Sequence, residues 1–206
     1  MTRGAFGFHV ARLRRDETAL SAWSGSRRAL VQELTGRHVA IVGNACALAQ
    51  TENGARIDAS DLVVRINRAP RPAAVSHGTR TDWLALAVKL RKPEGDRIAP
   101  RRILWLSPKR KRLPFWVASR PGFYLYPLDE FARLQEKLGA PPTTGLMMID
   151  LVARSEARKI DLFGFDFFSS LSLTGSRTAA QVPHDFGAEK AWVEDLVARD
   201  RRIAIN

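Results

Sequence analysis

The sequence predicts an α/β protein with one Rossmann-like sheet and helices on both of its faces, and three observations lead to this class. Short apolar runs recur along the chain between turn residues, as in strands that are covered on both faces. Segments with helical apolar spacing lie between these runs. Several runs end directly in glycine or asparagine, at the position where open α/β sheets bind ligands.

Two predicted strands open the sheet. Val39 to Val42 is followed by Gly43-Asn44, and Leu62 to Ile66 is followed by Asn67. A glycine directly after a strand lets the backbone turn tightly beside a bound group. The small residues from Ala45 to Gln50 are expected to form at least one helical turn. The unit contains neither GxGxxG nor a Walker lysine loop, so it does not support a dinucleotide or triphosphate site. Asparagines that only cap turns are the structural alternative.

Composition limits the possible partners. The 206 residues, 45% hydrophobic and 26% charged, suit one globular domain. The net charge of +12 favours an anionic partner, whether a sugar nucleotide, a phosphorylated glycolipid, a membrane surface or nucleic acid. The single cysteine, Cys46, excludes an internal disulfide and a zinc site built from cysteines. No apolar run approaches the length of a membrane span.

The N-terminal region combines arginines with apolar residues. Met1 to Arg15 has the pattern of a basic amphipathic segment that contacts a membrane, but a frayed, solvated terminus is the interpretation we prefer. A helix is expected from about Ser26 to Leu34, ended by Gly36.

The centre of the chain has weaker signals. Arg71 to Arg80 is predicted to be a loop with a solvated His77, and Thr81 to Val88 to be a strand or a strand–helix junction. Leu90 to Arg102 is expected to lack regular structure because two prolines and a glycine interrupt it. Ile103 to Leu106 is the next predicted strand.

A basic run, Lys109 to Arg112, follows that strand. We interpret it as a solvated face, with the attraction of an anionic acceptor or a lipid headgroup as the alternative. Phe123 to Tyr126 is a further predicted strand. Leu128 to Leu138 is an amphipathic helix whose four apolar residues, Leu128, Phe131, Leu134 and Leu138, are expected to be core.

A hydroxyl-rich segment begins the next predicted helix. Thr143, Thr144 and Gly145 lead into LMMIDLVARSEA, and the unpaired N–H groups and dipole of such a helix start can bind an anion. A simple threonine cap is the structural alternative. The following strand, Lys159 to Phe163, ends in Gly164-Phe165.

The last chemical signal is His184, which follows Pro183 at the entrance of a predicted helix. A neutral imidazole is the usual general base near pH 7. Glu189 is expected to be a carboxylate of the first helical turn, which helps the helix to start and orients the loop. Ile203 to Ile205 is the closing strand.

Three segments, in this order, resemble the motifs of the animal-type sialyltransferases, glycosyltransferase family 29. VGN, IDASDLVVRINRAP and GTRT resemble the large sialylmotif, PPTTGLMMIDLV with KIDLFGFD resembles the small one, and His184 with Glu189 matches the very short one. The resemblance extends from Val39 nearly to the end of the chain. It implies the sialyltransferase-type variant of the GT-A fold. It also implies that residues 37–206 form the catalytic domain, after a basic segment and lead-in helix at residues 1–36.

The resemblance also implies roles for single residues. In this family the matching positions contact the cytidine monophosphate (CMP) donor or act as catalytic base. The implied donor contacts are Asn44, Asn67, Thr143, Thr144, Gly145, Gly164 and Phe165, and the implied base is His184. The activity would be inverting transfer of sialic acid, or of a related keto sugar such as Kdo, from a CMP-activated donor to a glycan or glycolipid hydroxyl. Neither a metal nor another cofactor is expected.

Three departures from the family qualify this expectation. No membrane anchor precedes the motifs, and positions near Val39 and Glu156 lack the paired cysteines, so we expect a bacterial-style cytoplasmic enzyme, with peripheral contact to the inner face of an anionic membrane left open. Asp166 to Val182 contains no His or Tyr of the third motif, and the short Arg71 to Pro142 connection implies a reduced acceptor region. A non-catalytic basic module for nucleic acid or anionic lipid is the competing interpretation. It explains the charge but not three ordered motifs, so we expect no nucleic-acid partner.

Overall fold

The chain forms one fully parallel sheet. The computed structural model describes residues 4–166 and 183–206. Among these residues seven strands pair in the order β5-β4-β3-β2-β1-β6-β7, and every neighbouring pair is parallel. The strands are β1 (His38–Val42), β2 (Leu62–Ile66), β3 (Trp83–Leu86), β4 (Arg102–Trp105), β5 (Phe123–Leu125), β6 (Lys159–Phe163) and β7 (Ile203–Ile205). The predicted α/β class is therefore confirmed.

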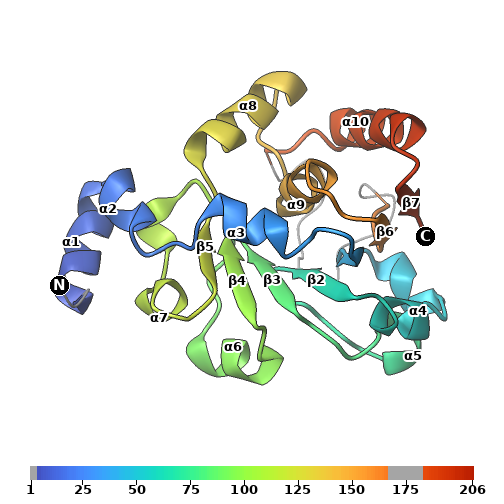
Figure 1. The fold of residues 1–206 in the computed structure, drawn as a ribbon, viewed down its shortest axis with the longest axis horizontal. Coiled ribbons are helices and arrows are strands. Elements are labelled where there is room, and N and C mark those ends of the chain that lie inside the picture. Colours follow the sequence, from blue (N-terminus) through green and yellow to red (C-terminus); the bar gives the residue numbers. More distant parts are fainter. Residues whose placement is uncertain (1–3, 167–182) are drawn as a thin grey trace.

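Helices cover both faces because each central strand is apolar on both sides. Val39 and Ile41 of β1 join the larger core, whereas Ala40 and Val42 point into a smaller core on the opposite face. The larger core is closed by α3 (Arg27–Gln32), α8 (Leu128–Leu138), α9 (Thr144–Ala153) and α10 (Phe186–Arg199). Figure 1 shows α8, α9 and α10 together along this face.

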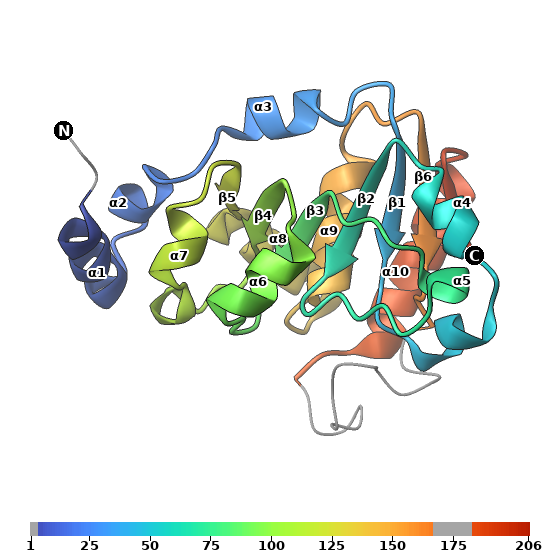
Figure 2. The same cartoon turned by 90° about the horizontal axis from the view of Figure 1, so that it is seen from below.

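The opposite face has two separate apolar clusters. One lies over β3, β4 and β5 and involves α1 (Ala5–Arg14), α2 (Glu17–Ser21), α6 (Lys92–Ile98) and α7 (Phe115–Ala118). The other lies over β1, β2 and β6 and involves the 3-10 helix η1 (Cys46–Gln50) and α4 (Gly54–Asp58). The short α5 (Ala74–His77) packs on α4, and a second 3-10 helix, η2 (Arg110–Arg112), follows β4. Figure 2 shows α1 beyond the β5 end of the sheet, and Figure 1 shows it far from β7.

The order of the strands creates a switch point between β1 and β6. From β1 the chain adds β2 to β5 on one side, and it then crosses back to place β6 on the free side of β1. Ligands of open α/β sheets bind outside the carboxyl ends of the strands at such a point. Residues that follow β1 and β6 therefore occupy the position that the fold makes available for a site.

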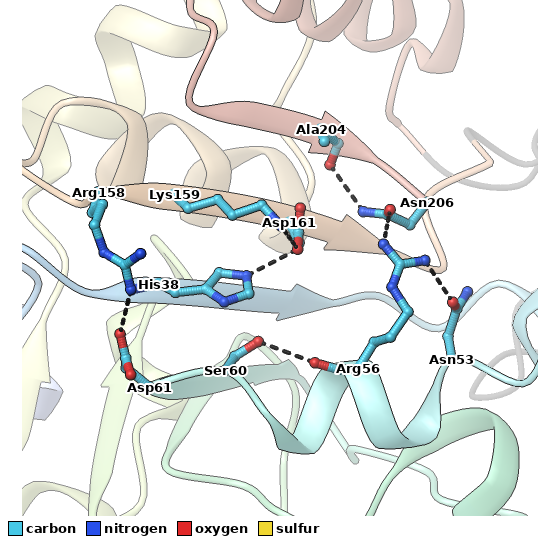
Figure 3. A network of polar contacts seen from close by, with 10 residues as sticks. All are labelled: His38, Asn53, Arg56, Ser60, Asp61, Arg158, Lys159, Asp161, Ala204 and Asn206. Atoms are coloured by element: carbon cyan, nitrogen blue, oxygen red, sulfur yellow. Dashed lines mark hydrogen bonds and ion pairs between the residues drawn. The ribbon is translucent and has the colours of Figure 1, made fainter.

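Polar contacts tie β1 to β6 away from that edge. His38 Nε2 and Lys159 Nζ both lie within 3 Å of a carboxylate oxygen of the buried Asp161, at 2.9 and 2.8 Å (Figure 3). Burial alone would raise the pKa of Asp161, but the hydrogen bonds from Lys159 and His38 outweigh it and leave that pKa lowered. On the same face, Arg56 of α4 donates to Asn53 and to Asn206 after β7. These contacts hold the strands on both sides of the switch point in register.

The N-terminal segment is a correction to the prediction. Residues 5–14 form a helix rather than a frayed terminus, and its Phe8 is fully buried against Trp23 and Phe115. Leu90 to Arg102 also differs, because it contains α6 with Pro93 in the first turn, where proline costs no helical hydrogen bond. Gly95 of α6 leaves room for the Trp116 ring.

Smaller differences concern the centre of the chain. The loop predicted at Arg71 to Arg80 contains α5, and the strands predicted around β3, β4 and β5 differ from the structure at their ends. Leu128, predicted to be core, is 38% exposed at the start of α8, although Leu134 is fully buried. No helix among the described residues is long and apolar enough to span a membrane.

Candidate functional site at the β1–β6 switch point

Three of the motif segments meet where β1 and β6 end. A Cβ atom on Gly43 would lie 2.3 Å from the carbonyl oxygen of Gly164, so only glycine allows this approach of the two strand ends. The Phe165 ring lies against both Gly43 and Gly145, since a Cβ on Gly145 would be 2.7 Å from that ring. The start of α9 is therefore packed directly on the carboxyl ends of β1 and β6.

The two asparagines lie at the adjacent strand ends. Asn44 follows β1 and its Nδ2 donates to the carbonyl oxygen of Ile66 at 3.3 Å, directly before Asn67. Asn67 adopts a left-handed φ of 55°, and its Oδ1 accepts a 2.9 Å hydrogen bond from Ala87 N after β3. Asn67 thus has a structural role in joining the ends of β2 and β3, as the turn-capping alternative expected. Its donor contact stays a prediction.

The start of α9 has amide groups that point out of the helix. Thr143 is the N-cap, and its hydroxyl accepts a hydrogen bond from Leu146 N at 3.1 Å. Within the described part of the chain, the N–H groups of Thr144 and Gly145 have no hydrogen-bond partner, as is usual for the first turn of a helix. With the positive end of the dipole, they form an anion-binding position.

Thr143 itself is held by a buried carboxylate of α10. Glu189 Oε1 accepts from Thr143 N at 2.6 Å, and Glu189 Oε2 accepts from the Thr143 hydroxyl at 2.7 Å. Glu189 is only 3% exposed. Burial raises the pKa of Glu189 to about 7, and the charge of Asp185 adds to this rise, although the two Thr143 hydrogen bonds oppose it. Glu189 therefore lies in the first turn of α10, as predicted, but its carboxylate acts across to α9.

His184 is oriented by a second contact between the same two segments. Its Nδ1 lies 2.7 Å from the carbonyl oxygen of Pro141. Because a carbonyl can only accept, the neutral ring has its proton on Nδ1 and a free electron pair on Nε2. This is the tautomer in which Nε2 can take a proton from a hydroxyl. The ring is partly buried, and Asp185 next to it caps α10.

Sequence reasoning did not find the Pro141 carbonyl or the clamp from Glu189 to Thr143. A backbone carbonyl has no signature in the residue type, and each contact joins residues more than 40 positions apart, 43 in one case and 46 in the other. The only available signal was a carboxylate at a fixed distance after His184. The predicted residues otherwise form one continuous set of contacts from Asn67 to His184.

The GTRT loop is organised by a buried arginine. Arg65 of β2 donates to the carbonyl oxygens of His77 and Arg80. Asp58 of α4 accepts hydrogen bonds from Thr79 and Arg80. Burial lowers the pKa of Arg65 to about 10. Burial, followed by the charge of Arg65, lowers the pKa of His77.

Two expectations about charged loops are therefore wrong. His77 is 1% exposed and bonded to Ser76, not solvated. Arg110, within the basic run, is buried and donates to Glu17 and to the Tyr126 carbonyl, whereas Lys109, Lys111 and Arg112 are exposed as predicted.

The surroundings of the switch point contain a shallow hollow beside Gly164. It is lined on one side by η1 and on the other by the chain that follows β6, with Ala45, Leu48, Phe165 and Asp166 among its residues. The described residues include no group of three or more His, Cys, Asp or Glu that could hold a metal ion. The segment in which the third motif was sought lies, beyond Asp166, outside the described residues.

Glycines, asparagines, a helix start and an oriented histidine thus lie together at the switch point, where open α/β folds bind ligands. The family model for glycosyltransferase family 29 (sialyltransferase) matches residues 7–89. This match covers less than half of the chain and agrees with the family resemblance noted in the sequence.

Solved structures support the same fold. A mammalian sialyltransferase in complex with Gal-beta-1-3GalNAc-ortho-nitrophenol superposes with a TM-score of 0.63 at 19% identity, over 85% of this chain and 71% of that one. The Campylobacter jejuni sialyltransferase CstII with the substrate analogue CMP-3FNeuAc gives a TM-score of 0.55 at 15% identity, over 82% and 80%. A CstII variant in complex with CMP gives 0.58 at 14%, over 82% and 81%. No curated protein sequence matches the chain.

Proposed function

We propose that this protein transfers sialic acid, or a related keto sugar, from a CMP-activated donor to a hydroxyl group of a glycan or glycolipid. His184 is the general base, and the configuration at the anomeric carbon is inverted. Asn44, Asn67, Thr143, Thr144, Gly145, Gly164 and Phe165 bind the donor. No metal takes part, because the leaving group is already a stabilised phosphate monoester.

One observation carries this proposal. The segment before α9 and the segment that starts α10 are joined twice, by Pro141 to His184 and by Thr143 to Glu189. The candidate base and the candidate anion site are therefore parts of one preorganised unit. Displacement at an anomeric carbon requires a correctly oriented base and preorganised dipoles that stabilise the leaving group.

The reaction can be written with these groups. Nε2 of His184 takes the proton of the acceptor hydroxyl while the hydroxyl oxygen forms a bond to the anomeric carbon. The bond from that carbon to the phosphate oxygen breaks, and its electron pair stays on CMP. The N–H groups of Thr144 and Gly145 stabilise the charge that develops there. Attack from the face opposite the leaving group inverts the configuration.

Thr143 has a modified part in this proposal. Its N–H and hydroxyl proton are both donated to Glu189, so its contribution is to fix the first turn of α9. A direct donor contact from Thr143 would use the remaining acceptor capacity of the hydroxyl or require it to rotate.

The relatives support the choice of substrates. The two CstII complexes contain CMP and a CMP-sugar analogue, and that of the mammalian enzyme contains a glycan derivative. Kdo as the transferred sugar is the alternative, because most of the proposed contacts are with the nucleotide. The single free Cys46 is compatible with the reducing cytoplasm that we propose as the location.

A donor panel tests the proposal. CMP release is measured with CMP-sialic acid and CMP-Kdo, with and without glycan acceptors, and each reaction is repeated in EDTA. We expect saturable, acceptor-stimulated release from one CMP-keto sugar that persists in EDTA. Absence of release from every donor by folded protein would contradict the proposal, and loss of turnover in EDTA that a divalent ion restores would contradict its metal-free mechanism.

A further inference from the structure

Helix α1 is attached to the β5 end of the molecule by one of its faces. Phe8 is fully buried and Ala11 nearly so, and the Phe8 ring packs edge-on against Trp23 at 5.7 Å between centroids. On the flank of the helix, Arg12 donates to the carbonyl oxygen of Leu113, directly after η2, at 3.1 Å. The orientation of α1 about its own axis is therefore fixed.

The face turned away from the core is apolar. Phe6 and Leu13 are 83% and 71% exposed, the largest values among the exposed large hydrophobic residues of the described chain. Val10 lies between them and is partly buried. Because the three are spaced by four and three residues, they lie within about 60° of one another around the helix and form one apolar stripe.

Cations flank the apolar stripe of Phe6, Val10 and Leu13. Arg14 and Arg15 end the helix on one side. On the side where Arg12 meets Leu113, the η2 loop carries the exposed Lys109, Lys111 and Arg112. None of these five has an ion-pair partner among the residues that the structure describes.

The nearby carboxylates do not neutralise this surface. Residues 4–15 and 109–112 contain no Asp or Glu. The nearest in sequence are already engaged, Asp16 as the N-cap of α2 and Glu17 with Arg110. The local charge is therefore strongly positive beside an exposed apolar stripe.

We infer that α1 and the η2 loop form a docking surface for an anionic lipid bilayer. The cations match lipid phosphates, and the apolar stripe enters the boundary between headgroups and acyl chains. A nucleic acid would satisfy the cations alone and leave Phe6 and Leu13 in water. A bilayer surface satisfies both features at once, with α1 lying flat on it.

The position of this surface suits an acceptor that is itself in the membrane. All strands are parallel, so η2, which follows β4, leaves the sheet at the same edge as the residues after β1 and β6. The bound protein therefore keeps the site edge on the side of the lipid, although α1 lies at the opposite end of the sheet (Figures 1 and 2). This last step, a glycolipid acceptor, rests on the proposed function, whereas the docking itself does not.

The test is cosedimentation with vesicles of phosphatidylcholine alone and of phosphatidylcholine with 30% phosphatidylglycerol, about a third of the lipid being anionic. We expect the wild-type protein to bind only the anionic vesicles, and more weakly as salt rises. Phe6→Ser/Leu13→Ser should weaken binding by about tenfold or more. Lys109→Glu/Lys111→Glu should weaken it by at least about fivefold for each charge removed.

Arg201→Glu is the matched control, because Arg201 is an exposed cation near β7 at the far end of the molecule, and its loss should change binding much less. Circular dichroism and CMP release in solution should be unaltered in the Phe6→Ser/Leu13→Ser protein. Absence of binding to the anionic vesicles would overturn the inference. So would binding that Phe6→Ser/Leu13→Ser leaves unchanged, or tighter binding to duplex DNA that depends on the same lysines.

Discussion

The two ends of the sheet are held together by different kinds of contact. At the β1–β6 end, buried polar groups join segments that are distant in sequence, as in the contacts from Thr143 to Glu189 and from Pro141 to His184. At the β5 end, the rings of Phe8 in α1, Trp23 after α2 and Phe115 in α7 pack together, while most charges remain on the surface. A buried polar contact is costly unless its geometry is correct, whereas aromatic packing tolerates more variation. The difference matches the two roles that we propose, catalysis at the first end and attachment at the second.

The largest expected effect is on turnover, when one histidine at each end of the sheet is replaced. His184→Ala should lower turnover by about 10²–10⁴-fold while CMP affinity changes little, because we propose that the phosphate contacts come from α9. The exposed His9 of α1 is the matched control, and His9→Ala should retain wild-type turnover in solution. Turnover and CMP affinity are measured for both folded proteins. Similar losses for the two variants would remove the distinction between the ends.

The buried carboxylate of Glu189 makes stability at the β1–β6 end depend on pH. The folded chain holds the pKa of Glu189 at about 7, above the ordinary value of 4.5, so between these values it binds more protons than the unfolded chain. This contribution to stability is fully present below about pH 4.5 and is lost as the pH rises through about 7. At 1.36 kcal/mol per pH unit, its size is at most about 3 kcal/mol.

Glu189→Gln isolates this contribution, because the amide can still accept from Thr143 N and donate to the Thr143 hydroxyl. We expect chemical denaturation at pH 5, 6, 7 and 8 to show the wild-type protein losing stability relative to the variant as the pH rises. Parallel curves for the two proteins would show that Glu189 is not a buried acid. Glu189→Ala should also slow turnover, since Thr143 and the start of α10 are then no longer joined.

Replacing one glycine at each end by alanine compares how closely the two ends are packed. In Gly43→Ala the new methyl group meets the Gly164 carbonyl, which is backbone and cannot move away cheaply, so a loss of about 1–3 kcal/mol is expected. Gly7→Ala in α1 meets no atom within 4 Å and should be neutral or stabilise the helix by about 0.5–1 kcal/mol. Thermal unfolding measures both. A Gly43→Ala protein as stable as Gly7→Ala would mean that β1 and β6 do not approach this closely.

The smallest effect concerns Asn67. Asn67→Ala removes the bond to Ala87 N and places alanine at a φ of 55°, for an expected loss of about 1–2 kcal/mol. Asn67→Gly removes the backbone strain of alanine at this φ, but it does not restore the hydrogen bond from Ala87 N. Unfolding and CMP calorimetry on both variants separate the two roles of Asn67. Donor affinity that falls equally in both would assign the side chain to the donor, and unchanged affinity in both would leave it only the structural role.

Much of the fold could be predicted because its signals are local. β1, β2, β6 and β7 are apolar runs bounded by turn residues, and α8 and α9 have a clear cap or helical period. The sequence offered helix α1 only as the less favoured alternative, because Phe8 is buried by residues elsewhere in the chain, Trp23 and Phe115 among them. Helix α6 was missed because Pro93 was interpreted as a breaker, although a proline in the first turn favours a helix.

The candidate site could be predicted in its residues but not in its contacts. The ordered motifs pointed to His184, the Thr143 helix start and Gly164. The orientation of His184 depends on the carbonyl of Pro141. The hydrogen bonds that Thr143 donates depend on the carboxylate of Glu189, 46 residues away. Both contacts arise only when α9 and α10 pack together, so no local pattern contains them.

The central claim is that the switch point between β1 and β6, and not the basic β5 end, binds the nucleotide. Titration of isotope-labelled protein with CMP, followed by amide resonances, tests this most directly, since free amides of a helix start respond to a bound phosphate. We predict saturable shifts at Thr144, Gly145 and Asn44, with α1 and the η2 loop unchanged. Shifts confined to Lys109, Lys111 and Arg112, with Thr144 and Gly145 unmoved at saturation, would contradict the account.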